Sequence, residues 1–89
     1  MVRQFEVYLH PQPSQRSAFP FLVVVQHDGV PVSAGEVLVV PLAQLIGGTG
    51  SRLLPIVSLD GEALQFLAPL LRRVSAARLR NLKGRVIED

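Results

Sequence analysis

Side chains that could carry out acid–base or metal chemistry are few in this 89-residue chain. It has two histidines, no cysteine and seven scattered carboxylates, and no spacing among them is typical of a metal site. His27 and Asp28 are adjacent, but neighbouring residues on an extended chain point to opposite faces, so they cannot support each other. His10 follows a predicted strand and is expected at the surface. We therefore predict no catalytic residue, no metal ligand and no cofactor.

Basic side chains are strongly concentrated toward the C-terminal end. Six of the nine basic residues fall within fourteen positions, and we predict them as partner-binding residues: Arg72, Arg73, Arg78, Arg80, Lys83 and Arg85. Such a cluster favours an anionic partner, either nucleic acid or an acidic protein segment. The same pattern also fits a solvated basic surface, and the composition leaves both interpretations open.

A glycine-rich stretch, residues 47–50, invites comparison with a phosphate-binding loop. No Lys-Ser or Lys-Thr pair follows the glycines, and no long helix is predicted to begin there. The stretch is therefore interpreted as a flexible connection.

The element around which the chain can be organised is a β-hairpin over residues 54–67. Apolar and polar residues alternate along both arms, and the Asp60-Gly61 pair between them suits the two positive-φ positions of a type I′ turn. Pro55 lacks an N–H and is expected at the start of the first arm. A hairpin alone is marginal in water, so further strands must cover it.

Period-two alternation and β-branched runs predict those strands. They are expected at residues 4–9, 21–26 and 36–42, with a strand end or bulge at Pro41. The proline-containing residues 10–20 and residues 30–35 are expected as loops, residues 27–29 as a turn, and residues 43–46 as one helical turn.

Apolar residues at spacings of three and four predict a short amphipathic helix over residues 68–82. Pro69 would start it and Gly84 would end it, and residues 85–89 could form a last strand. Short strands with little helix indicate a mostly β protein, either a small antiparallel barrel or a strongly bent sheet.

Length and composition indicate one globular domain over residues 1–89, with 48% hydrophobic and 18% charged residues. The richness in Val and Leu suggests that apolar side chains remain exposed on one copy, so we expect a homodimer. The lack of cysteine fits the cytoplasm. The longest apolar run, residues 19–25, is too short to span a membrane, and we expect a soluble protein without a signal peptide.

Four segments in register resemble the CcdB family of plasmid-maintenance toxins. They are QFEVYLHP at residues 4–11, PFLVVVQHD at 20–28, LVVPLA at 38–43 and SRLLPIVSLDGE at 51–62. The resemblance implies an SH3-like β-barrel, a homodimer and the toxin role in a type II toxin–antitoxin pair. It also implies DNA gyrase, through its GyrA subunit, as the target and an acidic, CcdA-like antitoxin as the partner, with no enzymatic activity.

The resemblance fails at the C-terminal end of the given chain. Family members continue into a C-terminal helix with a tail that contacts gyrase, whereas this sequence ends in Glu88-Asp89. No position matches that tail, so no gyrase-contacting residue is carried over. We expect toxic activity to be reduced or lost.

The alternative is an endoribonuclease of the structurally similar MazF type. That activity needs basic and hydroxyl side chains around the scissile phosphate, for which the sequence offers Arg3, Ser14, Arg16, Thr49 and Arg52. A nucleic-acid-binding module without catalysis has less support, because the aromatic residues lie mostly in predicted strand interiors.

Overall fold

Antiparallel strand pairing organises almost the whole described chain. The computed structural model describes residues 2–27, 35–44 and 55–88, and these contain eight strands and three single turns of 3-10 helix. In chain order they are β1 (Glu6–Leu9), η1 (Pro13–Gln15), β2 (Phe21–Val24), β3 (Glu36–Gln44), β4 (Ile56–Leu59), β5 (Glu62–Phe66), η2 (Ala68–Leu70), β6 (Arg72–Ser75), η3 (Ala76–Arg78), β7 (Leu82–Arg85) and β8 (Ile87–Glu88).

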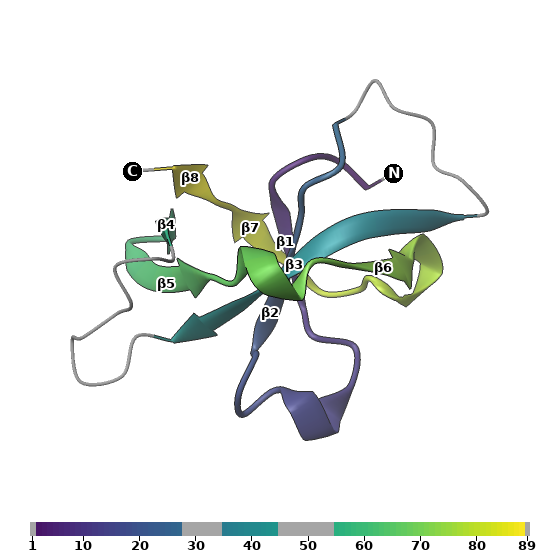
Figure 1. Ribbon diagram of the computed structural model, residues 1–89, viewed down its shortest axis with the longest axis horizontal. Helices are drawn as coiled ribbons and strands as arrows, with labels where there is room; N and C mark the ends of the chain where they lie inside the picture. Colours follow the sequence, from purple (N-terminus) through teal and green to yellow (C-terminus); the bar gives the residue numbers. More distant parts are fainter. Residues whose placement is uncertain (1, 28–34, 45–54, 89) are drawn as a thin grey trace.

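The sheet curls until its two ends meet. Its strand order is β7-β1-β2-β3-β5-β4-β8, with β6 added to β3. Since β7 and β8 stand at opposite ends of this order but are separated in sequence only by Val86, the ends must approach each other (Figure 1). The Val86 N–H donates to the Phe5 carbonyl at 3.1 Å, which fixes the junction to the segment before β1. The predicted mostly β, antiparallel barrel is thereby confirmed.

The central strands β1, β2 and β3 are buried on both faces. One cluster of buried residues faces the inside of the curled sheet: Val7, Val23, Val40, Leu42, Val57, Leu59 and Leu64. A second cluster lies on the other face, where β6 and η3 cover the strands: Tyr8, Leu22, Val24, Val37, Val39, Val74 and Leu79. This double burial explains why β2 is a continuous apolar run and not an alternating one.

The predicted hairpin is confirmed as β4 and β5. Leu59 pairs with Glu62 across the turn, and Asp60 and Gly61 have φ values of +50° and +84°. Two consecutive positive-φ residues are what a type I′ turn requires. Pro55 precedes the first arm, and its carbonyl accepts the Phe66 N–H at 2.9 Å.

The prediction that Pro41 ends or bulges a strand is wrong. β3 continues through Pro41, which pairs with Leu22, and runs on to Gln44, so the predicted helical turn at residues 43–46 is also wrong for 43 and 44. On its other side β3 pairs with β6 up to Val39 and with β5 from Leu42. Pro41 thus lies between two partners, where a missing N–H leaves no ladder bond unmade.

The predicted helix over residues 68–82 is wrong as well. This segment forms η2, β6 and η3, and Gly84, expected to end the helix, lies inside β7 with φ +142°. β6 pairs with residues Glu36–Val39 of β3, which would otherwise be an unpaired edge. Long-range pairing with that edge outweighs the weak helical spacing.

The other expected strands are found close to their predicted places. β1 and β2 fall within residues 4–9 and 21–26, η1 interrupts the predicted loop at 10–20, and β7 and β8 replace the single strand expected at 85–89. The expectations for residues 28–34 and 45–50 lie outside the described residues.

Candidate functional site

The six predicted partner-binding residues differ in what their side chains contact. Arg72 contacts the ring of His10, and Arg85 donates to the Gln4 carbonyl at 3.1 Å, so both hold the protein together. Arg78 and Arg80 line a pocket, and neither guanidinium forms a hydrogen bond or ion pair with a described residue.

The other two basic residues are exposed in strands. Arg73 lies in β6 and Lys83 in β7, and neither is among the residues that line the pocket. They add positive charge to the surface outside this pocket.

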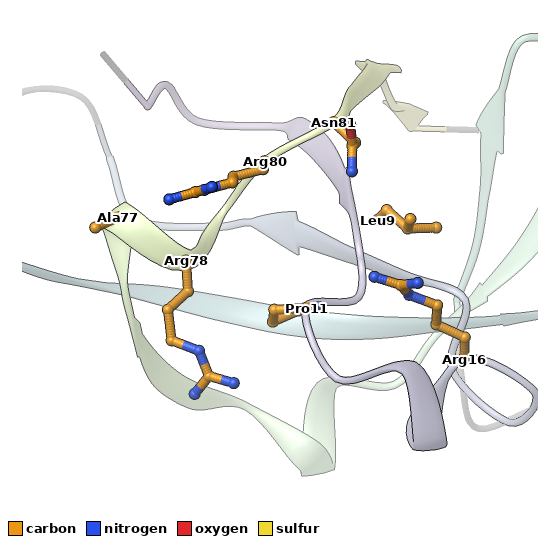
Figure 2. A pocket seen from close by; sticks show the side chains of 7 residues that line it. All are labelled: Leu9, Pro11, Arg16, Ala77, Arg78, Arg80 and Asn81. Carbon is orange, nitrogen blue, oxygen red and sulfur yellow. The ribbon is translucent and has the colours of Figure 1, made fainter.

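Three arginines from two segments surround this pocket, which has a volume of about 300 Å³. Figure 2 shows Arg16 on the η1 side of Pro11, and Arg78 and Arg80 on the η3–β7 segment on the other side, where their side chains extend in different directions. The described residues that line it are Leu9, Pro11, Arg16, Ala77, Arg78, Arg80 and Asn81. We call this the arginine pocket.

Local structure fixes Arg16 at the pocket wall. Pro13, at the first position of η1, suits the start of a helical turn because its missing N–H needs no partner there. The turn closes when the Arg16 N–H donates to the Pro13 carbonyl at 3.2 Å, and the Arg16 Nε then donates to the His10 carbonyl at 2.7 Å. The guanidinium is therefore held by one edge only.

A backbone hydrogen bond joins the two walls of the arginine pocket. Asn81 has φ +60°, a left-handed conformation that Asn tolerates better than most residues, and it follows Arg80 at the turn into β7. Its carbonyl accepts the N–H of Leu9, at the end of β1, at 3.3 Å. The pocket thus lies where the end of β1 meets the connection between η3 and β7.

His10 lies beneath the arginines and is buried, with 1% of its surface exposed, so the expectation of a surface residue is wrong. Its backbone N–H donates to the Pro20 carbonyl at 2.9 Å. Its Nδ1 lies 3.1 Å from the Gln12 backbone nitrogen, and its Nε2 lies 2.9 Å from a terminal nitrogen of Arg72. Both neighbours are donors, and a neutral imidazole accepts at one nitrogen while a protonated one accepts at none. The surroundings therefore favour the neutral ring.

The electrostatics of the site agree with this hydrogen-bond pattern. Burial lowers the pKa of His10, and the positive charges of Arg72, Arg16 and Arg78 lower that pKa further. Two of these three arginines line the pocket. A positive potential therefore extends from the arginine pocket to the buried ring beneath it.

The arginine pocket has the donors and the positive charge to bind an anion. None of the described residues that line it carries a carboxylate, hydroxyl or thiol group that could serve as a general base or nucleophile. Of the residues considered for an endoribonuclease, Arg16 is in the pocket, whereas Arg3 and Ser14 do not line it. Arg52 and Thr49 lie outside the described residues.

Arg16 was not among the predicted partner-binding residues, because more than fifty positions separate it from the basic cluster. It was considered only for the endoribonuclease. The available signal was weak: Arg16 is the one arginine of the predicted loop at 10–20. Only the pairing of β1 with β7 shows that this loop lies beside the cluster.

A second, apolar pocket of about 180 Å³ lies where the ends of the sheet meet. Phe5, Pro55, Val57, Phe66 and Val86 line it. None of these described residues has a polar side chain to orient a ligand, so the pocket is a weaker candidate for a specific site.

Two further properties bear on function. In the part of the chain that the structure describes, no group of three or more His, Asp or Glu residues is placed to hold a metal ion. Among the same residues, no helix is long and apolar enough to cross a membrane.

Comparison with known proteins places the chain in a family. A family model described as CcdB protein matches residues 4–88, which is nearly the whole chain. A search among curated proteins finds no match.

Proposed function

Because this chain belongs to the CcdB family of toxin–antitoxin toxins, we propose that it acts as the toxin of a type II pair by binding protein partners and not by catalysis. The proposed target is the GyrA subunit of DNA gyrase, and the proposed site of action is the cytoplasm. The observation that carries the proposal is the family match over residues 4–88, which spans every element of the barrel.

The second proposed partner is a cognate acidic antitoxin. The guanidiniums at the arginine pocket and the exposed Arg73 and Lys83 form a positive surface, which would attract an acidic segment over a distance and orient it on approach. Of the six residues predicted from the sequence, Arg78 and Arg80 are the strongest candidates for direct contact. Arg72 and Arg85 contribute charge while serving the fold.

We also propose a homodimer. Five large apolar side chains of the described residues are between 37% and 54% exposed: Phe5, Ile56, Leu70, Leu71 and Leu82. Exposed apolar surface of this kind supports association with a second copy.

The proposed function is tested by co-expression with the short acidic protein that we expect to be encoded beside this chain. The two proteins should co-purify as a complex, and RNA incubated with the isolated chain should stay intact. Sequence-dependent RNA cleavage would contradict the proposal and favour a MazF-type endoribonuclease. Stabilised gyrase–DNA cleavage complexes in a purified assay would support gyrase as the target.

A further inference from the structure

We propose that Arg16, Arg78 and Arg80 form an anchor site for carboxylate side chains of an acidic peptide segment. The inference deepens the proposed function, because it names the point at which an antitoxin-like partner would be gripped, and it rests on that function for the partner's identity. It also adds Arg16, which lies far from the basic cluster in the sequence.

The three guanidiniums have hydrogen-bond donors to spare. Arg16 uses its Nε to hold the His10 carbonyl, which leaves its terminal N–H groups for a ligand, and Arg78 and Arg80 contact no described hydrogen-bond acceptor. Arginine offers a planar pair of donors that matches the two oxygens of a carboxylate. Since no carboxylate among the described residues lines the pocket, these donors are available to a carboxylate of a ligand.

The site is held in place before any ligand arrives. Arg16 is fixed by η1 and by the His10 carbonyl, and the Leu9–Asn81 hydrogen bond holds the opposite wall. A site that is already ordered loses less conformational entropy on binding. The Arg16 side chain and the backbone of both walls are therefore held before a ligand binds, and a bound carboxylate would lower the repulsion among the three positive charges.

The lining of the arginine pocket favours a peptide over nucleic acid. Leu9, Pro11 and Ala77 provide apolar contacts beside the guanidiniums, as a chain of mixed acidic and aliphatic residues would require. None of the described residues that line the pocket is aromatic, so they offer no surface on which a base could stack.

The test measures binding of a fluorescently labelled peptide of alternating Glu and Leu at low ionic strength. The pocket variants are Arg16→Gln, Arg78→Gln and Arg80→Gln. Matched controls are Arg73→Gln and Lys83→Gln, which remove the same charge outside the pocket. Because Arg16→Gln also removes a hydrogen bond to His10, thermal melts check its folding, while Arg78→Gln and Arg80→Gln break no bond to a described residue.

Each pocket variant should weaken peptide binding about tenfold, which corresponds to about 1.4 kcal/mol. The controls should stay within about twofold of the parent because their charges lie outside the pocket and act on the peptide only through long-range attraction, without a direct hydrogen bond. Equal losses in pocket and control variants would mean that net charge alone attracts the peptide, and would overturn the site. Absence of peptide binding, or tighter binding of a single-stranded oligonucleotide of the same charge, would also overturn it.

A spectroscopic measurement places the ligand at the site independently of affinity. A carboxylate bound among the arginines should raise the pKa of the His10 ring, followed by NMR titration, because it offsets the repulsion that Arg16 and Arg78 exert. An unchanged His10 titration at saturating peptide would contradict the inference. Neither measurement depends on toxicity or gyrase, so failure of the proposed target leaves this test intact.

Discussion

His10 links three parts of the basic surface through one residue. Its N–H binds Pro20 at the far end of the loop, its carbonyl holds Arg16, and its ring contacts Arg72 in β6. Replacing the buried ring is costly because the Gln12 N–H and the Arg72 side chain would lose their partner, whereas the bonds to Pro20 and Arg16 are made by the His10 backbone and would remain. His10 therefore acts on the arginine pocket as a positioning residue, without lining it.

The first prediction concerns the pH dependence of stability. Burial and the facing charges of Arg72 from β6, Arg16 from the end of η1 and Arg78 from η3 lower the pKa of His10 from its ordinary value of 6.5. The unfolded chain therefore binds a proton at a higher pH than the folded protein does. The stabilising contribution of neutral His10 is fully present above 6.5 and is lost as the pH falls below that value.

Urea unfolding of the parent and of His10→Gln at about pH 7.5 and about pH 5.5 checks this sign. The parent should lose more unfolding free energy on acidification than the variant, in which the other titrating groups are unchanged. Equal losses would show that the ring is not held neutral.

The second prediction compares two glycines that both have positive φ. Gly61 has φ +84° and open space around the position of an added Cβ, whereas Gly84 has φ +142° and would place that Cβ 3.2 Å from the Leu59 Cδ1. Gly61→Ala should therefore cost about 1 kcal/mol through backbone strain alone, and Gly84→Ala about 2 kcal/mol or more. Thermal melts measure both, and the reverse order would be inconsistent with the close packing of β7 on the hairpin.

At the scale of elements, the segment after the hairpin decides between a helix and a strand. A helix over residues 68–82 would place Leu71 and Val74 on one apolar face, but in the structure Val74 is 7% exposed and Leu71 is 50% exposed. Val74→Ala should therefore destabilise the protein by about 2 kcal/mol and Leu71→Ala by less than about 0.5 kcal/mol. Similar costs for both substitutions, measured by chemical unfolding, would favour the helix.

The elements that local sequence specifies were predictable, and those that depend on distant partners were not. Asp60-Gly61 dictates its own turn, so the hairpin follows from a few residues. The segment carrying Val74 becomes a strand because β3 needs a partner there, and β3 passes through Pro41 because its partners change at that point. Neither reason can be read from the segment itself.

The candidate site, too, was predictable from the sequence only in part. Arg78 and Arg80 could be named from the density of basic residues, but the burial of His10 and the role of Arg16 could not. Both depend on contacts that the loop between β1 and β2 makes with distant segments: His10 contacts Arg72 in β6, and Arg16 shares a pocket with Arg78 in η3. Local sequence patterns do not predict such contacts.

At the scale of the whole molecule, the exposed apolar residues predict association. The chain should sediment as a dimer at micromolar concentration, and a stable dimer should bury about 1,200 Å² or more in total. A variant with Leu70 and Leu71 both changed to Ser tests whether these exposed residues take part, since neither is needed by the core of one copy. Sedimentation of the parent as a monomer would remove the dimer from the proposed function.

At the same scale, the proposed recognition of this protein by an acidic antitoxin through the arginine pocket is tested most directly by one kinetic measurement. The association rate of the cognate acidic antitoxin is measured by stopped flow at low salt. The parent is compared with Arg78→Gln/Arg80→Gln, and Arg73→Gln/Lys83→Gln serves as a control of equal charge. We predict that the pocket variant associates about tenfold more slowly than the control, and that the difference shrinks as salt screens the charges. Equal association rates for the pocket and control variants would contradict the account.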